Sequence, residues 1–116
     1  MSDGILRPLF LGFMRLHVLY HADKEAISGV ELMEELREHG YDIGPGTLYP
    51  MLHELERQGL LERENQIVAG RRRKCARITK RGRQVLCQAR AKLLELAREI
   101  IDDEDNRKKP KNAGTV

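Results

Sequence analysis

The sequence predicts a mainly α-helical protein with one small β-hairpin and a long C-terminal helix. Four stretches repeat apolar residues at steps of three and four, which is the period of an amphipathic helix. Two short runs suited to strands flank Gly70, and glycine favours a tight turn between them. The chain has 116 residues, of which 41% are hydrophobic, so its length suits one domain with one core.

The first two helices are predicted from spacing and capping. Apolar residues of the first, from Ile5 to Tyr20, recur at helical steps: Leu6, Leu9, Phe10, Phe13, Leu16 and Tyr20. The second begins at Ser28, because Ser28 and Glu31 can satisfy each other's free backbone amides as a capping box. It ends near His39, where Gly40 can adopt the left-handed conformation. Its expected core face consists of Val30, Met33 and Leu36, with Leu32 beside them.

A third helix follows a short turn. Pro45 has the fixed φ that suits a first helical position, and an apolar stripe ends before Gly59. The stripe consists of Leu48, Met51, Leu52 and Leu55. Pro50 lies within this stretch and removes one helical hydrogen bond, so we expect it to lie close to the first turn.

A hairpin and a last helix complete the predicted domain. The strands cover residues 60–68 and 73–79, and Thr79 caps a helix that runs to about Ile101. Its apolar seam has coiled-coil spacing: Leu86, Ala89, Leu93, Leu96 and Ile100. A second stripe beside it favours a dimer interface, and packing on the first helix alone is the alternative.

Three segments result from these predictions. Residues 1–79 form a DNA-binding domain of winged helix-turn-helix type, because three helices followed by a two-stranded hairpin are typical of that fold. Residues 80–101 form a dimerisation helix. Residues 102–116 are rich in charge and lack an apolar period, so we expect a disordered tail.

Charge indicates which surface meets a polyanion. The net charge is only +3, yet every charged residue from Gly70 to Arg83 is positive. The hairpin tip supplies Arg71, Arg72, Arg73 and Lys74, which suit phosphates or a narrow minor groove. The outward face of the third helix supplies Thr47, Tyr49, Pro50, His53 and Arg57, which suit the major groove of double-stranded DNA. An ordinary solvated helix face and a solvated basic loop are the alternatives.

One run of residues resembles a known family. Gly46-Thr47-Leu48-Tyr49-Pro50 and the residues that follow to Leu61 are similar to the hallmark segment of PadR transcriptional regulators. The segments Gly70–Lys74 and Ile78–Gly82 resemble that family's wing and the start of its last helix. The resemblance implies a homodimeric repressor of the compact subclass, which binds an inverted repeat and releases it on a signal. It also implies that Thr47, Tyr49 and the wing arginines face DNA.

Other functions receive less support. No nucleophile–base pair, phosphate loop or paired carboxylates in an apolar setting predict an enzyme or a cofactor. His17 and His21 have the spacing of two metal ligands, but no third ligand is marked in the sequence, so we expect no metal site. Cys75 and Cys87 fit no disulfide framework, and we expect both to be buried free thiols.

The sequence also bears on cellular location and on alternative functions. Arg7 and Arg15 interrupt the apolar N-terminal stretch, so we expect a cytoplasmic protein that does not associate with membranes. A small-molecule effector of unknown identity is among the expected partners. A protein-binding winged-helix module, or a sensor gated by a ligand or by redox state, are the alternatives to a DNA-binding regulator.

Overall fold

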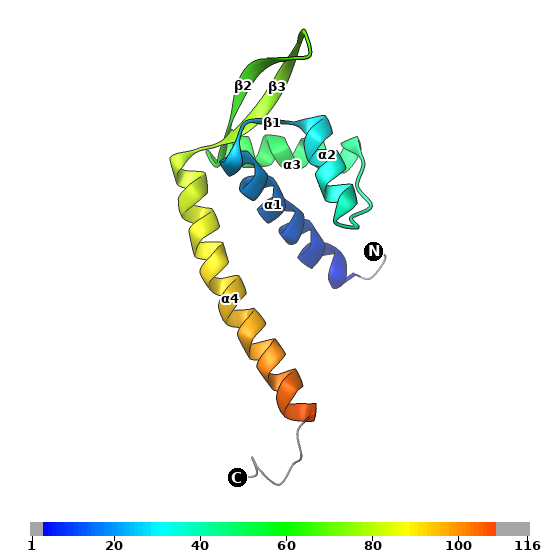
Figure 1. The fold of residues 1–116 in the computed structure, drawn as a ribbon, viewed down its shortest axis with the longest axis vertical. Helices are drawn as coiled ribbons and strands as arrows, with labels where there is room; N and C mark the ends of the chain where they lie inside the picture. Colours follow the sequence, from blue (N-terminus) through cyan, green and yellow to red (C-terminus); the bar gives the residue numbers. More distant parts are fainter. Residues whose placement is uncertain (1–3, 109–116) are drawn as a thin grey trace. The chain divides into compact units, whose positions relative to one another are not determined.

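The computed structural model describes residues 4–108, with side chains described to residue 103. Within this range the elements are α1 (Leu6–Lys24), β1 (Ile27–Ser28), α2 (Gly29–Glu38), α3 (Pro45–Arg57), β2 (Leu61–Val68), β3 (Arg71–Ile78) and α4 (Lys80–Lys108) (Figure 1). These elements confirm the predicted fold class. The chain divides into two compact units, Met1–Leu86 and Cys87–Val116, so the first unit extends past the predicted boundary at residue 79.

Helix α1 continues one turn beyond the predicted end at Tyr20. It runs to Lys24 because Ala22 lies four residues after Val18 on the same face, and both side chains are buried. Part of the connection predicted from residue 22 is therefore helical.

Helix α2 begins with the predicted capping box. The Glu31 backbone amide donates to Ser28 Oγ at 3.2 Å, and the Ser28 amide donates to Glu31 Oε1 at 3.1 Å. The helix ends before Gly40, whose φ of +91° confirms the predicted left-handed cap. Its core face differs from the prediction: Leu32 and Leu36 are fully buried, whereas Val30 is 44% exposed.

The hairpin predicted around Gly70 forms, with the two strands in antiparallel register from Leu61 opposite Ile78 to Val68 opposite Arg71. Ala69 and Gly70 make the two-residue turn, with φ of +52° and +77°. Positive φ at both positions is typical of a type I′ turn, whose twist matches that of the strands. The hairpin projects from the helices of the first unit (Figure 1).

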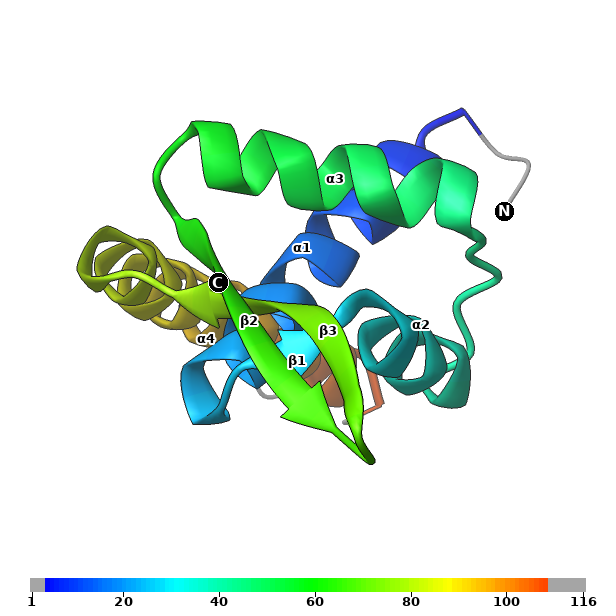
Figure 2. The ribbon, with the colours of Figure 1, turned by 90° about the horizontal axis from the view of Figure 1, so that it is seen from above.

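A third strand was missed in the sequence prediction. Ile27 and Ser28 of β1 pair with Ala76 and Cys75 of β3, which gives an antiparallel sheet in the order β1-β3-β2. Figure 2 shows β1 beside this hairpin at its base. A strand of two residues is too short to show the alternation of apolar and polar residues that predicts a strand. Its pairing with a distant strand was therefore not visible in the sequence.

The core of the first unit lies among α1, α2, α3 and the base of the hairpin. Its least exposed large side chains come from all three helices: Met14, Val18, Leu19, Leu32, Leu36 and Leu48. Ile78 and Leu61 close the core from the sheet side. Burial of this apolar surface, at about 25 cal/mol per Å², fixes α3 on the domain.

Helix α4 begins as predicted at a threonine cap. The Gly82 amide donates to Thr79 Oγ1 at 2.9 Å, and that hydroxyl donates to the Gly59 carbonyl at 2.6 Å. Gly82 is required at this position, because a Cβ there would lie 2.2 Å from the carbonyl oxygen of Leu60. The helix extends to Lys108 rather than ending at Ile101, so the predicted disordered tail is helical up to Lys108. Residues 109–116 of that tail lie outside the described part.

Among residues 4–108, none of the helices combines the length and the apolar character that crossing a membrane requires.

Candidate nucleic-acid interface

Helix α3 is fixed to the core by one face. Leu48, Met51 and Leu55 are buried, and Pro45 stands at the first helical position as predicted. Pro50 lies in the helix interior rather than in the first turn. The turn before the helix is held by Arg37, whose Nε donates to the Ile43 carbonyl at 3.1 Å.

The opposite face of α3 carries the residues predicted to contact DNA. Tyr49, Pro50, His53 and Arg57 are exposed, and Thr47 is half-buried. Arg57 is not a free cation, because its guanidinium forms an ion pair with the carboxylate of Glu54. A contact between Arg57 and a base must therefore compete with this pair.

Tyr49 is also positioned by a residue that the sequence prediction missed. A Cβ on Gly29, the first residue of α2, would lie 2.7 Å from both Cε1 and Oη of the Tyr49 side chain. The ring therefore packs directly on the backbone of α2 and remains 38% exposed. Gly29 follows the capping serine, and no spacing in the sequence relates it to residue 49.

A small pocket separates α3 from the hairpin. Tyr49, Leu52 and His53 line it from the helix, and Lys74 and Cys75 line it from β3. Its volume of 140 Å³ is below the range of about 300–1,000 Å³ that is usual for small-molecule sites. The pocket therefore marks a depression between the two predicted DNA-contacting elements and is too small for a typical effector.

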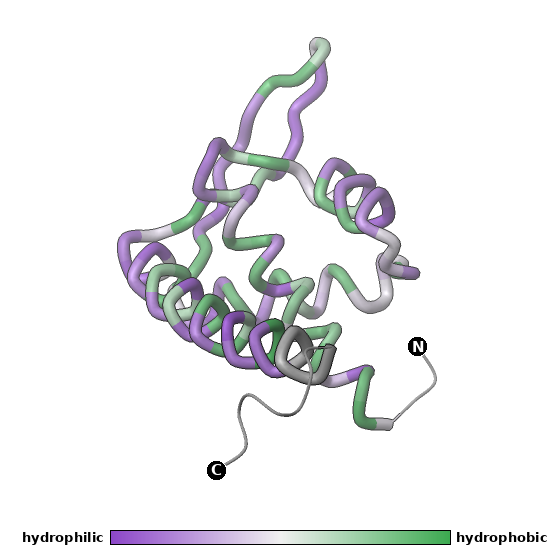
Figure 3. Tube along the Cα trace, turned by 60° about the horizontal axis from the view of Figure 1, so that its bottom comes forward, coloured by the Kyte–Doolittle hydropathy of each residue, from purple (hydrophilic) through white to green (hydrophobic). Residues whose placement is uncertain are grey.

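The basic residues of the hairpin lie on strand β3 rather than in the turn. Arg71, Arg72 and Lys74 are exposed, and Arg73 is half-buried. Successive strand residues point to opposite faces, so Arg71 and Arg73 share one face while Arg72 and Lys74 share the other. In Figure 3 one strand of the hairpin is hydrophobic towards its tip, and the other is strongly hydrophilic.

Acidic residues of β2 neutralise part of the positive charge of the hairpin. Glu64 accepts hydrogen bonds from Arg77 at 3.0 and 3.2 Å, and the first of these cross-strand contacts is an ion pair. The hydrogen bond from Arg77 is the main cause that lowers the pKa of Glu64. Arg83 is likewise paired, with Asp23 at 2.9 Å. Within residues 4–103, Arg71, Arg72, Arg73 and Lys74 form no ion pair, so the available cations gather near the turn.

The predicted dimerisation residues divide between the two units. Leu86 is only 4% exposed and belongs to the core of the first unit, so its assignment to the dimer seam was wrong. In the second unit Ala89 is half-buried. Leu93, Leu96 and Ile100 are 39%, 50% and 59% exposed.

The two cysteines differ from each other. Cys75 is buried at 3% exposure, and burial raises the pKa of its thiol. Cys87 is exposed, which contradicts the expectation that both are buried. Cys75 thus has the environment of a small apolar residue, and Cys87 does not.

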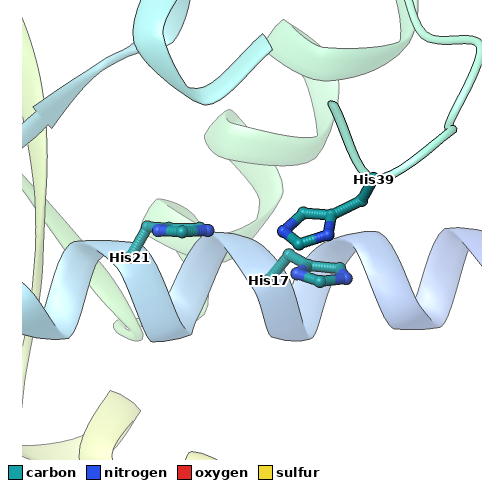
Figure 4. A group of neighbouring side chains, drawn as sticks. All are labelled: His17, His21 and His39. Carbon is teal, nitrogen blue, oxygen red and sulfur yellow. The ribbon is translucent and has the colours of Figure 1, made fainter. Parts of the chain in front are cut away.

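Three histidines lie together on the first unit. His17 and His21 project from α1, and His39 reaches them from the end of α2 (Figure 4). The candidate ligand atoms of the three imidazoles all lie within 4.8 Å of one another. The sequence marked no third ligand beside His17 and His21, and the structure places His39 where a third ligand would lie.

Residues 18–88 match the transcriptional regulator PadR-like family. The chain belongs to this family. It is 49% identical over 88 residues to the transcriptional regulator Rv3488 of Mycobacterium tuberculosis, an alignment that covers 76% of this chain and 82% of the relative. Membership in the PadR-like family makes this chain a transcriptional regulator and not an enzyme.

Solved structures share the fold of this PadR-like regulator. A PadR-like transcription factor from Bacteroides fragilis superposes with a TM-score of 0.71 at 25% identity, covering 86% of this chain and 98% of that one. A protein from Streptococcus mutans gives a TM-score of 0.75 at 24% identity, covering 84% and 92%, and shows likeness of fold alone.

Proposed function

We propose that this PadR-like regulator is a homodimeric repressor that binds an inverted repeat in double-stranded DNA. The observation that carries the proposal is the placement of an exposed helix face beside a strand with unpaired cations. The same pocket is bordered by Tyr49 and His53 on α3 and by Lys74 on β3. One DNA duplex can therefore contact both elements. The curvature and charge of a duplex suit such a combination.

Helix α3 is proposed to read the major groove. Its buried face holds it rigidly on the core, while Thr47, Tyr49, Pro50, His53 and Arg57 lie on its accessible side. Tyr49 packs on Gly29, so its orientation is fixed before DNA binds. Arg57 would exchange its Glu54 partner for a base edge or a phosphate.

Strand β3 is proposed to contribute affinity more than specificity. Arg71, Arg72, Arg73 and Lys74 lie at the end of a projecting hairpin, where they can reach phosphates or enter a minor groove. Because each phosphate contact releases condensed counterions, binding should weaken as salt concentration rises. Arg77 is not included, since Glu64 already neutralises it.

The second unit is proposed to form the dimer interface. Leu93, Leu96 and Ile100 repeat at coiled-coil steps and are exposed in a single chain, and Leu94 and Ile101 widen this apolar face. A symmetric dimer would present two α3 helices to half-sites about 10 base pairs apart. Occupancy of a promoter by such a dimer would repress transcription by excluding polymerase.

Salt titrations of DNA binding test the proposal. Wild type, Arg72→Ala, Tyr49→Ala and Arg57→Ala are measured on the upstream region of the protein's own gene and on a scrambled duplex. Arg72→Ala should weaken binding to both duplexes and lower the salt slope by about one per lost phosphate contact. Tyr49→Ala and Arg57→Ala should reduce discrimination, by about 1–3 kcal/mol where a bidentate base contact is lost.

A matched control separates these contacts from loss of positive charge in general. Arg15 is exposed on α1, and Arg15→Ala should leave the salt slope unchanged. Absence of salt-dependent binding by the wild type to any duplex would contradict the proposal and favour a winged-helix module that binds an acidic protein.

A further inference from the structure

The three-histidine group joins two elements that are separate in sequence. His17 and His21 occupy neighbouring turns of α1, a spacing at which two imidazoles can bind one ion. His39 is the C-cap residue of α2, and its ring stacks on His17 with centroids 4.4 Å apart. The His17 and His21 rings lie within 14° of parallel, with centroids 6.4 Å apart (Figure 4). The protein therefore brings three nitrogen donors to one place.

The surroundings of His17 shift the pKa of its imidazole. Burial lowers the pKa of His17, and the neighbouring His39 and His21 imidazoles lower it further, while Glu35 raises it. A neutral imidazole has one nitrogen lone pair free, and this is the form that binds metals.

His21 supplies a second, independent sign of a ligand. Its Nε2 atom is buried and has no hydrogen-bond partner among the residues that the structure describes. Glu35 Oε2 lies 3.7 Å from it, which is beyond hydrogen-bond distance but within reach of a shared ion. A buried polar atom without a partner destabilises the fold by about 1–3 kcal/mol, and a bound ion would remove that cost.

We propose that His17, His21 and His39 bind a divalent transition-metal ion of the zinc class. Three imidazole donors with a nearby carboxylate suit zinc or nickel better than magnesium or calcium, which prefer oxygen ligands. Glu35, whose carboxylate lies 3.7 Å from His21 Nε2, is placed to be a fourth ligand.

The three histidine nitrogens need to move only slightly closer together to bind one zinc ion. Tetrahedral zinc, with Zn–N near 2.0–2.1 Å, holds its donors about 3.3 Å apart. The donors here lie within 4.8 Å, so rotation of the rings and a slight shift of His39 bring them together. His39 is exposed and precedes the turn to α3, so this residue has room to move.

Zinc titration of the full chain tests the site. Under reducing conditions the wild type should bind one Zn²⁺ per chain, measured by calorimetry or by competition with a chromophoric chelator. Outer ligand partners alone change metal affinity by about 10–100-fold, so His39→Ala and His17→Ala should each weaken binding by more than about 100-fold. Co²⁺ in place of Zn²⁺ should give the visible absorption of a tetrahedral nitrogen site.

Matched variants identify the ligands. The chain has four histidines, and His53 lies outside the group, so His53→Ala removes one imidazole and should leave zinc affinity unchanged. Cys87→Ser should also leave it unchanged, which separates this site from the exposed thiol. Circular dichroism verifies the fold of each variant. Equal zinc affinity of His39→Ala and wild type, or no stoichiometric binding by the wild type, would overturn the proposal.

A consequence for regulation rests on the proposed function. A metal held by His39 would attach the turn before α3 to α1, so zinc should change the affinity of the wild type for its operator and leave that of His39→Ala unaltered. An unchanged operator affinity would overturn this regulatory role while the metal site stands. Absence of DNA binding with and without zinc, together with intact zinc binding, would instead contradict the DNA-binding proposal.

Discussion

The two units use the same apolar residue types in different ways. In Met1–Leu86, the side chains of Leu32, Leu36 and Leu48 are completely buried within one chain. In the following unit, Leu94 and Ile100 are 52% and 59% exposed. Helices α1 to α3 and the sheet supply one another with partners, whereas the described residues of the second unit, 87–108, belong to the single helix α4. The first unit therefore buries its apolar core within one chain. The apolar face of the second unit is suited to packing against another protein surface.

The largest expected effect concerns the face of the second unit. Replacing Leu93 and Leu96 together by aspartate should abolish the dimer, because each charge would be buried in an apolar interface at a cost of several kcal/mol. Sedimentation velocity measures the oligomeric state. Gln88→Asp, at an exposed polar position of the same helix, should leave the dimer intact. A double variant that still sediments as a dimer would show that this face does not hold the subunits together.

A leucine truncation in each unit sharpens the comparison. Leu36→Ala should lower the free energy of unfolding by about 2–5 kcal/mol, because it leaves a cavity in the core. Leu94→Ala should have a smaller effect that depends on protein concentration, since the proposed dimer would cover a side chain that is 52% exposed in the single chain. Denaturant melts at two protein concentrations measure both. Similar effects of the two variants at low concentration would contradict the distinction between the units.

The start of α4 offers a test of packing within the first unit. Gly82→Ala places a Cβ against the Leu60 backbone and the Ile78 side chain, so we expect a loss of about 1–3 kcal/mol in stability. Gly12→Ala is the matched control, because a Cβ on Gly12 meets no atom within 4 Å and a mid-helix alanine stabilises by about 0.5–1 kcal/mol. If thermal melts shifted equally for both, the close approach of α4 to β2 would not be a constraint.

The smallest effect concerns the cysteines, one in each unit. Iodoacetamide should modify Cys87 quickly, and Cys75 only on unfolding, because Cys75 is buried and its thiol has a raised pKa. Mass spectrometry of timed samples gives both rates, and modification of Cys87 alone should leave the melting temperature unchanged. Rapid labelling of Cys75 in folded protein would indicate that the sheet opens readily.

The sequence by itself determined the local features of this protein. Helical spacing located α1, α2 and α3, the Ser28–Glu31 pair located the start of α2, and Gly70 located the hairpin turn. These features depend on residues a few positions apart, whose interactions are fixed by backbone geometry. The outward face of α3 was predictable for the same reason.

Only the tertiary structure decided which distant residues meet. It pairs β1 with β3, adds Leu86 to the core instead of the seam, and joins Glu64 to Arg77 across the hairpin. It also brings His39 to His17 and His21, which turns an ordinary helical spacing into a candidate metal site. Contacts of this kind depend on how helices and strands pack together, and neither periodicity nor capping along the chain specifies that packing.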